Sequence, residues 1–322
     1  MNDIRRQFRA RLGLSLAVLF AALQVFQLFI LPAWLLPLDA AWGWLLLVPV
    51  LLTNGWWAFI HEAIHGALFP GHWANRLAGR LHGVLFGAGF DLLRWGHLLH
   101  HAYSRTPRDR TEVYEDGRDN PALFTLVYYL RLLGGLYLFE VLWSLLMLAP
   151  RPLLSTLAGR LSGSGNPIAP LADKVLAMPT LVATRQDALA ILALYGLSFL
   201  LYGQHAWMLW LALAGRGLLV SLMDNVFHYG TPLNDRCYAL DLEAPAWVSA
   251  LILHFNLHGA HHRHPALGWW ELPLRHRDEG ARPQGRLAPA LVAQLRGPIP
   301  ASRLERLRGQ TNPPVRPEPA EG

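Results

Sequence analysis

Long stretches without a charged side chain constrain this sequence most. Residues 12–38 and 40–60 hold no Lys, Arg, Asp or Glu, and Asp39 lies between them. Either run, at roughly 27 and 21 residues, is long enough for a helix to cross a bilayer, which takes about 20 apolar residues. The chain is 53% hydrophobic and only 16% charged, whereas soluble domains carry about 25% charged residues. We therefore expect an integral membrane protein whose first two spans form a hairpin.

A second pair of apolar runs, 188–203 and 206–223, predicts another hairpin. Residues 123–150 are interrupted by Arg, Gly and Glu, and either a single crossing or a re-entrant or interfacial helical pair fits them. The basic residues in the following stretch, 151–186, favour a cytoplasmic position for that stretch, so we interpret 123–150 as the helical pair. Residues 244–255 are too short to span and are expected to lie at the interface. The predicted fold is all-α, with about four transmembrane helices in two hairpins, interfacial helices and a cytoplasmic histidine-rich cap.

One charged residue, Arg216, falls inside the last apolar run. A charged side chain within a membrane needs a partner. The candidate partners are Glu140 and Asp224.

Basic residues set the expected orientation. The first run is too long for a signal peptide and lacks a small-residue cleavage site, so we expect a retained helix. Cytoplasmic segments are enriched in Arg and Lys, which places the N-terminus and the histidine boxes in the cytoplasm. The arginines that precede the first run are Arg5, Arg6, Arg9 and Arg11.

The rest of the chain divides simply. We expect a membrane domain over residues 1–280 and a polar, Arg- and Pro-rich C-terminal tail over 281–322, partly disordered, with residues 312–322 as the disordered end. The basic stretch 151–186 contains Ser and Gly near Ser162–Pro167 and is expected to be a flexible cytoplasmic connector.

Cysteine content and charge exclude several classes. A single cysteine, Cys237, excludes a disulfide framework and Cys-based zinc or iron–sulfur sites. The net charge is +6, but no basic stripe interleaved with aromatic residues is present, so we expect no nucleic-acid partner.

Histidine is in excess, with 15 in the chain. Three clusters have helical spacing, so each directs its imidazoles at one point. Eight imidazoles exceed what one four-coordinate ion can bind, which implies two metals. Asp224 and His228 share a helix face near the end of the last span, which makes His228 a ninth candidate ligand and Asp224 its candidate partner. The clustered residues are His61, His65, His97, His100, His101, His258, His261 and His262.

The boxes HEAIHG (61–66), HLLHHAYSR (97–105) and HGAHHRHPALGW (258–269) resemble those of the integral-membrane fatty acid desaturase and hydroxylase superfamily. The order, the spacing and the frame from Asn256 to Pro265 are similar, and the resemblance covers about residues 40–275. Carotenoid ketolases carry similar boxes.

The resemblance implies two non-haem iron ions held by the eight box histidines, with His228 matching the family's additional histidine. It further implies O2 as co-substrate and a membrane lipid or acyl chain as substrate, most simply for a fatty acyl desaturase. Hydroxylase and ketolase activity remain alternatives. No electron-carrier segment accompanies the membrane domain, so electrons are expected from a separate ferredoxin-, rubredoxin- or cytochrome b5-like protein.

Polar and aromatic residues near the boxes have candidate roles as well. Trp95, Trp269 and Trp270 either line a substrate channel or anchor the chain at the interface. Acidic and amide side chains are candidate partners of the imidazole N–H groups, or members of a solvated face. Besides Asp224, these are Glu62, Asp91, Asp109, Glu112, Asp116 and Asn256.

Two other classes compete with the oxidoreductase. His61-Glu62-x-x-His65 satisfies the H-E-x-x-H pattern of zinc proteases, but an intramembrane protease leaves six box histidines unused. A histidine-rich metal transporter or a bis-histidine haem carrier has ligands within its spans, whereas these histidines lie at span ends. His205, in the turn of the second hairpin, has no expected role.

Overall fold

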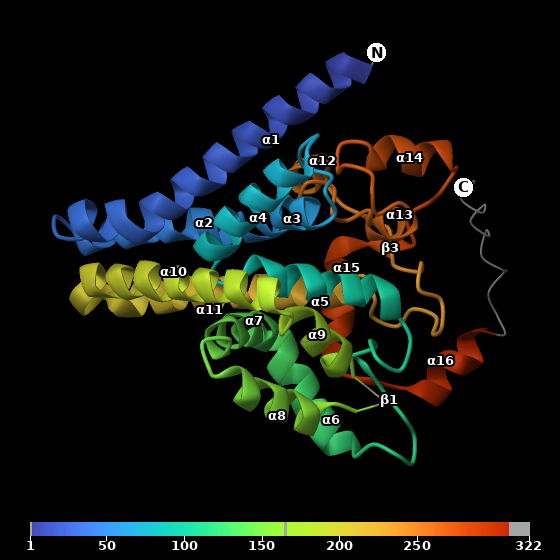
Figure 1. Cartoon of the computed structure of the whole chain (residues 1–322). Coiled ribbons are helices and arrows are strands. Elements are labelled where there is room, and N and C mark those ends of the chain that lie inside the picture. The colour runs from blue at the N-terminus through green and yellow to red at the C-terminus, as the bar shows by residue number, and fades with distance from the viewer. Residues whose placement is uncertain (1, 164–165, 309–322) are drawn as a thin grey trace.

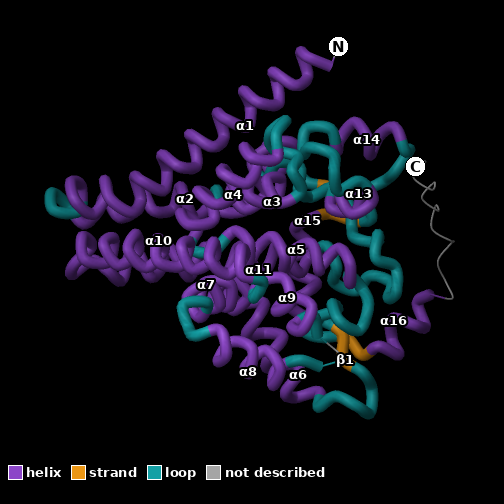
Figure 2. The backbone as a smooth tube through the Cα atoms, viewed as in Figure 1, coloured by secondary structure: helices purple, strands orange, loops and turns teal. Residues whose placement is uncertain are grey.

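The computed structural model describes residues 2–163 and 166–308. Helices dominate, and the chain packs as a bundle whose long helices lie side by side (Figures 1 and 2). The N-terminal half comprises α1 (Asn2–Val25), η1 (Phe26–Leu35), η2 (Ala40–Leu46), α2 (Leu47–Leu51), α3 (Thr53–Ile64), α4 (His72–Phe86), α5 (Phe90–Tyr103), β1 (Val113–Tyr114), α6 (Pro121–Leu130), η3 (Arg131–Gly135) and α7 (Leu136–Leu146). The C-terminal half comprises α8 (Arg151–Leu161), α9 (Ile168–Val175), α10 (Met178–Tyr202), η4 (Gly203–His205), α11 (Ala206–Val226), β2 (Leu242–Glu243), α12 (Ala246–Leu251), α13 (His258–Arg263), α14 (Leu272–Asp278), β3 (Gly285–Arg286), α15 (Leu287–Ala293), η5 (Gln294–Arg296), β4 (Ile299–Pro300) and α16 (Ala301–Arg308).

Both predicted hairpins are present. The first runs out through α1 and η1 and returns through η2, α2 and α3, and the Asp39 side chain caps the first turn of η2. The second runs through α10 and α11, and Gly203 makes the turn between them with a positive φ of 50°. Tyr202 at this turn donates a hydrogen bond to the Gln27 carbonyl oxygen, 2.8 Å away, which ties the two hairpins together.

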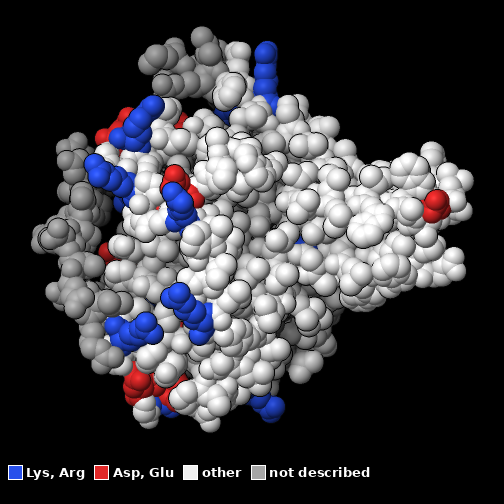
Figure 3. Space-filling view, turned by 180° about the vertical axis from the view of Figure 1, so that it is seen from behind, with Lys and Arg blue, Asp and Glu red and all other residues white. Residues whose placement is uncertain are grey.

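Within residues 2–163 and 166–308, three helical stretches are long and apolar enough to cross a membrane: Gln7–Leu35, Pro121–Leu146 and Met178–Val226, the last folded back at the η4 turn. The pair α2 and α3, bent by 41°, makes a fourth candidate. The far end of the hairpins projects as a surface almost free of charge, while most charged side chains on that face cover the opposite end (Figure 3). The chain is therefore an all-α membrane protein.

The 121–146 stretch is kinked rather than straight. Gly134 has a φ of 113°, and Leu133 also leaves helical geometry. The kink lies against α11, where the Gly217 Cα is 3.9 Å from the position a Gly134 Cβ would occupy. The two helices α6 and α7, joined at this break, agree with the predicted helical pair. The re-entrant or interfacial placement of the pair stays a prediction.

The prediction of a flexible connector over 151–186 is wrong for most of its length. Helices α8 and α9 occupy it, because Leu154 and Val175 find an apolar surface on Leu92, Met147 and Leu181. The Ser- and Gly-rich centre includes residues 164–165, which lie outside the described part of the chain.

Arg216 has partners other than those predicted. Its guanidinium donates to Gln24 Oε1 at 2.9 Å, and to Tyr195 Oη and the Phe86 carbonyl oxygen at 3.1 Å each. The predicted carboxylate partners are wrong: Asp224 instead pairs with Arg131 at 2.9 Å. Neutral oxygens thus accept hydrogen bonds from both terminal nitrogens of Arg216 in the bundle interior, whereas its buried Nε has no partner among the described residues.

The C-terminal segment continues the packed domain past residue 280. Strands β2 and β3 pair in parallel, as do β1 and β4. Leu287 belongs to the main apolar core, and Tyr128 donates to the Gln294 carbonyl oxygen at 2.7 Å. The end of the predicted tail, 309–322, lies outside the described residues. The predicted interfacial segment 244–255 contains the short helix α12, whose Trp247 is 68% exposed.

Candidate metal centre

Nine histidines from four parts of the chain gather into two adjoining groups. Within each group one ring nitrogen per histidine lies within 4.8 Å of all the others. The five-histidine group contains His61, His65, His97, His101 and His261, and the four-histidine group contains His100, His228, His258 and His262. These are the nine ligands expected from the sequence.

Close helix packing brings the first two boxes together. His61 lies near the end of α3, and α5 carries the second box. Helices α4 and α5 form a tight pair: Gly87 ends α4 with a φ of 98°, and a Cβ on Gly79 would lie 2.2 Å from the Phe90 ring. Small residues at these positions allow α5 to approach the rest of the core.

The second and third boxes each divide between the two groups. In the second box His97 and His101 join the five-histidine group, whereas His100 joins the four-histidine group. The third box does the reverse, since only His261 joins the five-histidine group. Residues i and i+4 lie about 40° apart around a helix, and residue i+3 lies about 60° to the other side. The prediction that each box points at one site is therefore wrong for boxes two and three. Helix α5 and helix α13 each supply ligands to both groups.

Distances between ring nitrogens fit a bound metal ion in each group. Nε2 atoms lie 2.9 Å apart for His65 and His97, and 3.1 Å apart for His101 and His261. In the four-histidine group the separation between His100 and His228 is 3.1 Å. Ligands about 2.1 Å from one ion are about 3.0 Å apart at right angles and about 3.4 Å apart in a tetrahedron. The closest pairs in both groups therefore have separations compatible with imidazoles that share one ion.

Unsatisfied nitrogens point to the same conclusion. Both ring nitrogens of His61 are buried and have no hydrogen-bond partner in the described part of the chain. The His61 ring centroid lies 4.3 Å from that of His261 and 4.4 Å from that of His97. A buried polar atom without a partner is costly unless something unseen binds it, and a metal ion is what this set of donors fits.

Burial keeps these imidazoles neutral, which is the form that binds metal. Burial, reinforced by neighbouring imidazoles, lowers the pKa of His97, His228 and His261 well below the usual value. The pKa of His65 falls to about 4. His100 is the exception: burial opposes its charged form, but the Asp109 carboxylate outweighs burial and raises the pKa of His100.

Two of the predicted acidic residues lie against the histidines. Asp109 Oδ2 is 2.5 Å from His100 Nδ1. Glu62 Oε1 is 3.8 Å from His61 Nδ1, and its other oxygen accepts the Trp269 backbone N–H at 3.0 Å. Glu62 thereby connects the first box to the end of the third.

The other predicted acceptors bind elsewhere. Asp91 pairs with Arg76 at 2.8 Å, and Glu112 pairs with the buried Arg105 at 2.5 Å. Asp116 accepts the Ser302 backbone N–H at 3.1 Å. Each of these carboxylates binds a cation or an N–H donor that is not a box histidine, and a role for them in orienting imidazoles stays a prediction.

Asp224 and Asn256 also have partners other than an imidazole. Arg131 binds the Asp224 carboxylate, and His228 Nδ1 has no partner among the described residues. The Asn256 side chain donates to the Leu242 carbonyl oxygen at 2.8 Å, so this amide fixes the backbone before the third box and does not contact an imidazole.

Other contacts around the histidines carry little sequence signal. His262 Nδ1 lies 3.3 Å from the Arg236 carbonyl oxygen, a backbone atom that any residue supplies. Phe227 stacks on His258 with ring centroids 4.8 Å apart, and Phe255 meets His61 edge-on at 5.0 Å. In the sequence, the two phenylalanines are marked as neighbours of the histidine groups only by their positions beside His228 and Asn256. These rings make the lining of the groups partly apolar.

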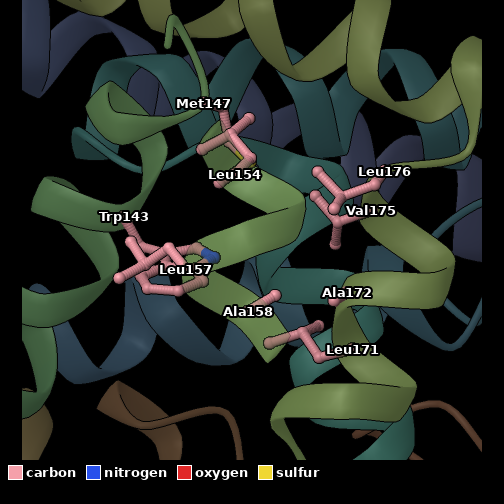
Figure 4. Close-up of a pocket in the computed structure, with 9 residues that line it drawn as sticks. All are labelled: Trp143, Met147, Leu154, Leu157, Ala158, Leu171, Ala172, Val175 and Leu176. Atoms are coloured by element: carbon pink, nitrogen blue, oxygen red, sulfur yellow. The ribbon is translucent and has the colours of Figure 1, made fainter. Parts of the chain in front are cut away.

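The three candidate channel tryptophans lie in different surroundings. Trp95 packs beside the small apolar pocket between α7, α8 and α9, into which Trp143, Leu154 and Val175 project (Figure 4). None of the nine residues that line this pocket is a histidine. Trp269 stacks on His254, and Trp270 lies under the Arg9 guanidinium at 5.8 Å. His205 lies in the η4 turn of the second hairpin.

Comparison with known families agrees with this arrangement. The family model "Fatty acid desaturase" matches residues 39–289, more than half of the 322-residue chain. No curated protein and no solved structure matches the chain. The matched segment contains all nine histidines of the two groups. The chain therefore belongs to the fatty acid desaturase family.

Proposed function

We propose that this protein is an O2-dependent oxidoreductase with two iron ions, which acts on C–H bonds of a membrane lipid as a fatty acyl desaturase. Two adjoining groups of buried or half-buried imidazoles, with the nearest ring nitrogens about 3 Å apart, carry the proposal. Iron bound there would supply O2 activation, which side chains alone cannot provide. The five-histidine group and the four-histidine group would each hold one ion.

The residues of this chain would contribute position and environment. Asp109 orients His100, and Glu62 lies between His61 and the backbone after the third box. Phe227 and Phe255 limit water near the imidazoles. The apolar hairpins would give a lipid access from the bilayer. Positioning of the acyl chain then decides between loss of a second hydrogen and transfer of oxygen.

Hydroxylation and ketolation of a lipid or carotenoid use the same metal groups and are the closest alternatives. A zinc protease is disfavoured, because Glu62 accepts a backbone N–H and three further imidazoles join His61 and His65 of the first box. The positions of the ligands at helix ends disfavour a transporter or a haem carrier.

Orientation and redox partner belong to the same proposal. The arginines before the first span favour a cytoplasmic N-terminus, and the histidine groups would then face the cytoplasm. Electrons would come from a separate ferredoxin-, rubredoxin- or cytochrome b5-like protein. O2 would be the co-substrate.

Lipid and carotenoid profiles of cells expressing the protein test this function. Wild type should produce new unsaturated acyl chains, His100→Ala should not, and His205→Ala should match wild type. New hydroxylated lipids or ketocarotenoids would instead support the alternatives. Equal products from wild type and His100→Ala would refute the proposal.

A further inference from the structure

The third box forms a short helix with two distinct faces. On α13 the three histidines point to the metal-binding groups. The three remaining residues, Gly259, Ala260 and Arg263, lie on the other side, and each meets Asp241. A six-residue helix has little stability of its own, so contacts from outside must set its position.

Asp241 contacts both ends of this helix. Its Oδ1 accepts the Ala260 backbone N–H at 2.8 Å, a first-turn donor that has no acceptor within the helix. Leu257, the residue immediately before the first residue of α13, makes no side-chain hydrogen bond that caps the helix. Oδ2 lies 3.2 Å from Arg263 in the last turn and 3.6 Å from His276 of α14. Asp241 is 0% exposed, so these contacts form away from water, where they are strongest.

The backbone around Asp241 is itself fixed. Its N–H donates to Gln284 Oε1 at 2.6 Å, and its carbonyl accepts the Gln284 N–H at 2.8 Å. A Cβ on Gly259 would lie 2.4 Å from the Ala239 carbonyl oxygen and 2.9 Å from Asp241 Oδ2. Glycine in the box therefore lets the 239–241 segment approach the helix closely.

We propose that Asp241 is the positioning residue of the third histidine box, holding α13 at the rotation that sends His258 and His262 to one metal-binding group and His261 to the other. This role adds a residue that positions the ligands of the proposed iron site, and it rests on the proposed function for the identity of the metal. Loss of the contact should affect the four-histidine group most, because α13 supplies two of its four ligands but only one of five in the other group.

The test compares Asp241→Asn with wild type in the full-length, detergent-solubilised protein. Asparagine keeps the shape but removes the charge that Arg263 and His276 face. In metal-free protein, amide hydrogen exchange in α13 should become at least about tenfold faster. On anaerobic addition of Fe2+, one of the two sites should bind at least about tenfold more weakly, the usual consequence of losing a group that orients ligands.

The matched control is Asp187→Asn. Asp187 is also buried and pairs with an arginine, Arg80, at 2.6 Å, but it lies on α10. This control should keep wild-type exchange in α13 and both iron sites. Equal changes in the two variants would show a general loss of stability and overturn the proposal, as would wild-type exchange and iron binding in Asp241→Asn.

Arg263→Gln provides a milder variant if Asp241→Asn does not fold. Arg263 is 29% exposed on its side chain, and its loss should shift exchange and iron binding in the same direction. Arg275→Gln, which removes a surface contact with Glu279, should change neither. Wild-type behaviour of a folded Arg263→Gln would then overturn the proposal. The exchange measurement needs no metal, so it decides the role of Asp241 even if wild type binds no iron and the proposed function fails.

Discussion

The contact between Asp109 and His100 offers a sharp test of how the metal centre is built. Asp109 Oδ2 lies 2.5 Å from His100 Nδ1, with the two side chains 19% and 24% exposed. The carboxylate fixes the ring so that Nε2 faces the four-histidine group, and it makes the ring a stronger donor. Asp109→Asn keeps an oxygen that can accept from Nδ1–H but removes the negative charge.

The expected loss follows from this geometry. Removing a carboxylate that orients a ligand imidazole typically weakens metal binding 10- to 100-fold. Because the amide retains a neutral hydrogen bond and the contact is partly exposed to solvent, we expect the lower end, about tenfold or about 1.4 kcal/mol. Only one of the two sites should be affected, since His100 belongs to the four-histidine group alone.

Chelator competition against the iron-loaded protein measures this loss. Asp235→Asn is the control, because the Asp235 side chain accepts the Cys237 backbone N–H in a surface turn, at 3.2 Å, and hydrogen-bonds no histidine among the described residues. Wild type and the control should release iron in parallel, and Asp109→Asn should release one equivalent at about tenfold lower chelator concentration. Release indistinguishable from wild type would refute the orienting role of Asp109.

Three further predictions concern the ligands, the core and pH. His261→Ala should lower the iron content measured by elemental analysis, and retention of wild-type iron and activity would refute its assignment. Arg216→Met should lower the free energy of unfolding by at least about 2 kcal/mol, since buried oxygens lose their donor; unchanged thermal unfolding would contradict this. Burial lowers the pKa of His65 from 6.5 to about 4, so the unfolded chain binds more protons than the folded chain between these values. Metal-free protein should therefore lose stability as the pH falls from 6.5 toward 4, and a constant melting temperature over that range would contradict the buried neutral state.

The parts of this fold that could be predicted are those encoded by neighbouring residues. Uncharged runs gave both hairpins, because crossing a bilayer depends on the length and polarity of one segment. Helical spacing gave the eight box histidines, because their pattern is visible without any knowledge of packing. His228 was found from its place at the end of the last apolar run.

The errors arose where partners depend on packing between distant segments. Arg216 was matched to carboxylates by charge, but Gln24 and Tyr195 come closer once the helices assemble. Asp224 shares a helix face with His228, yet Arg131 reaches it from another helix. No sequence pattern identified Asp241 as a partner of α13. The residues in contact are about twenty positions apart, and an irregular segment joins them.

The division of each box between two groups was missed for a related reason. Residue spacing fixes the angles between side chains around one helix. It does not fix which of the two histidine groups each side chain points toward. The positions of α5 and α13 relative to each other decide that, and they depend on the close approaches at Gly79 and Gly259.

Metal content tests the central claim most directly. Purified protein should contain about two irons per chain, with no Soret band in its optical spectrum, and His100→Ala should lose iron while His205→Ala keeps it. One zinc per chain, or a haem absorption band, would contradict the two-iron centre on which this account depends.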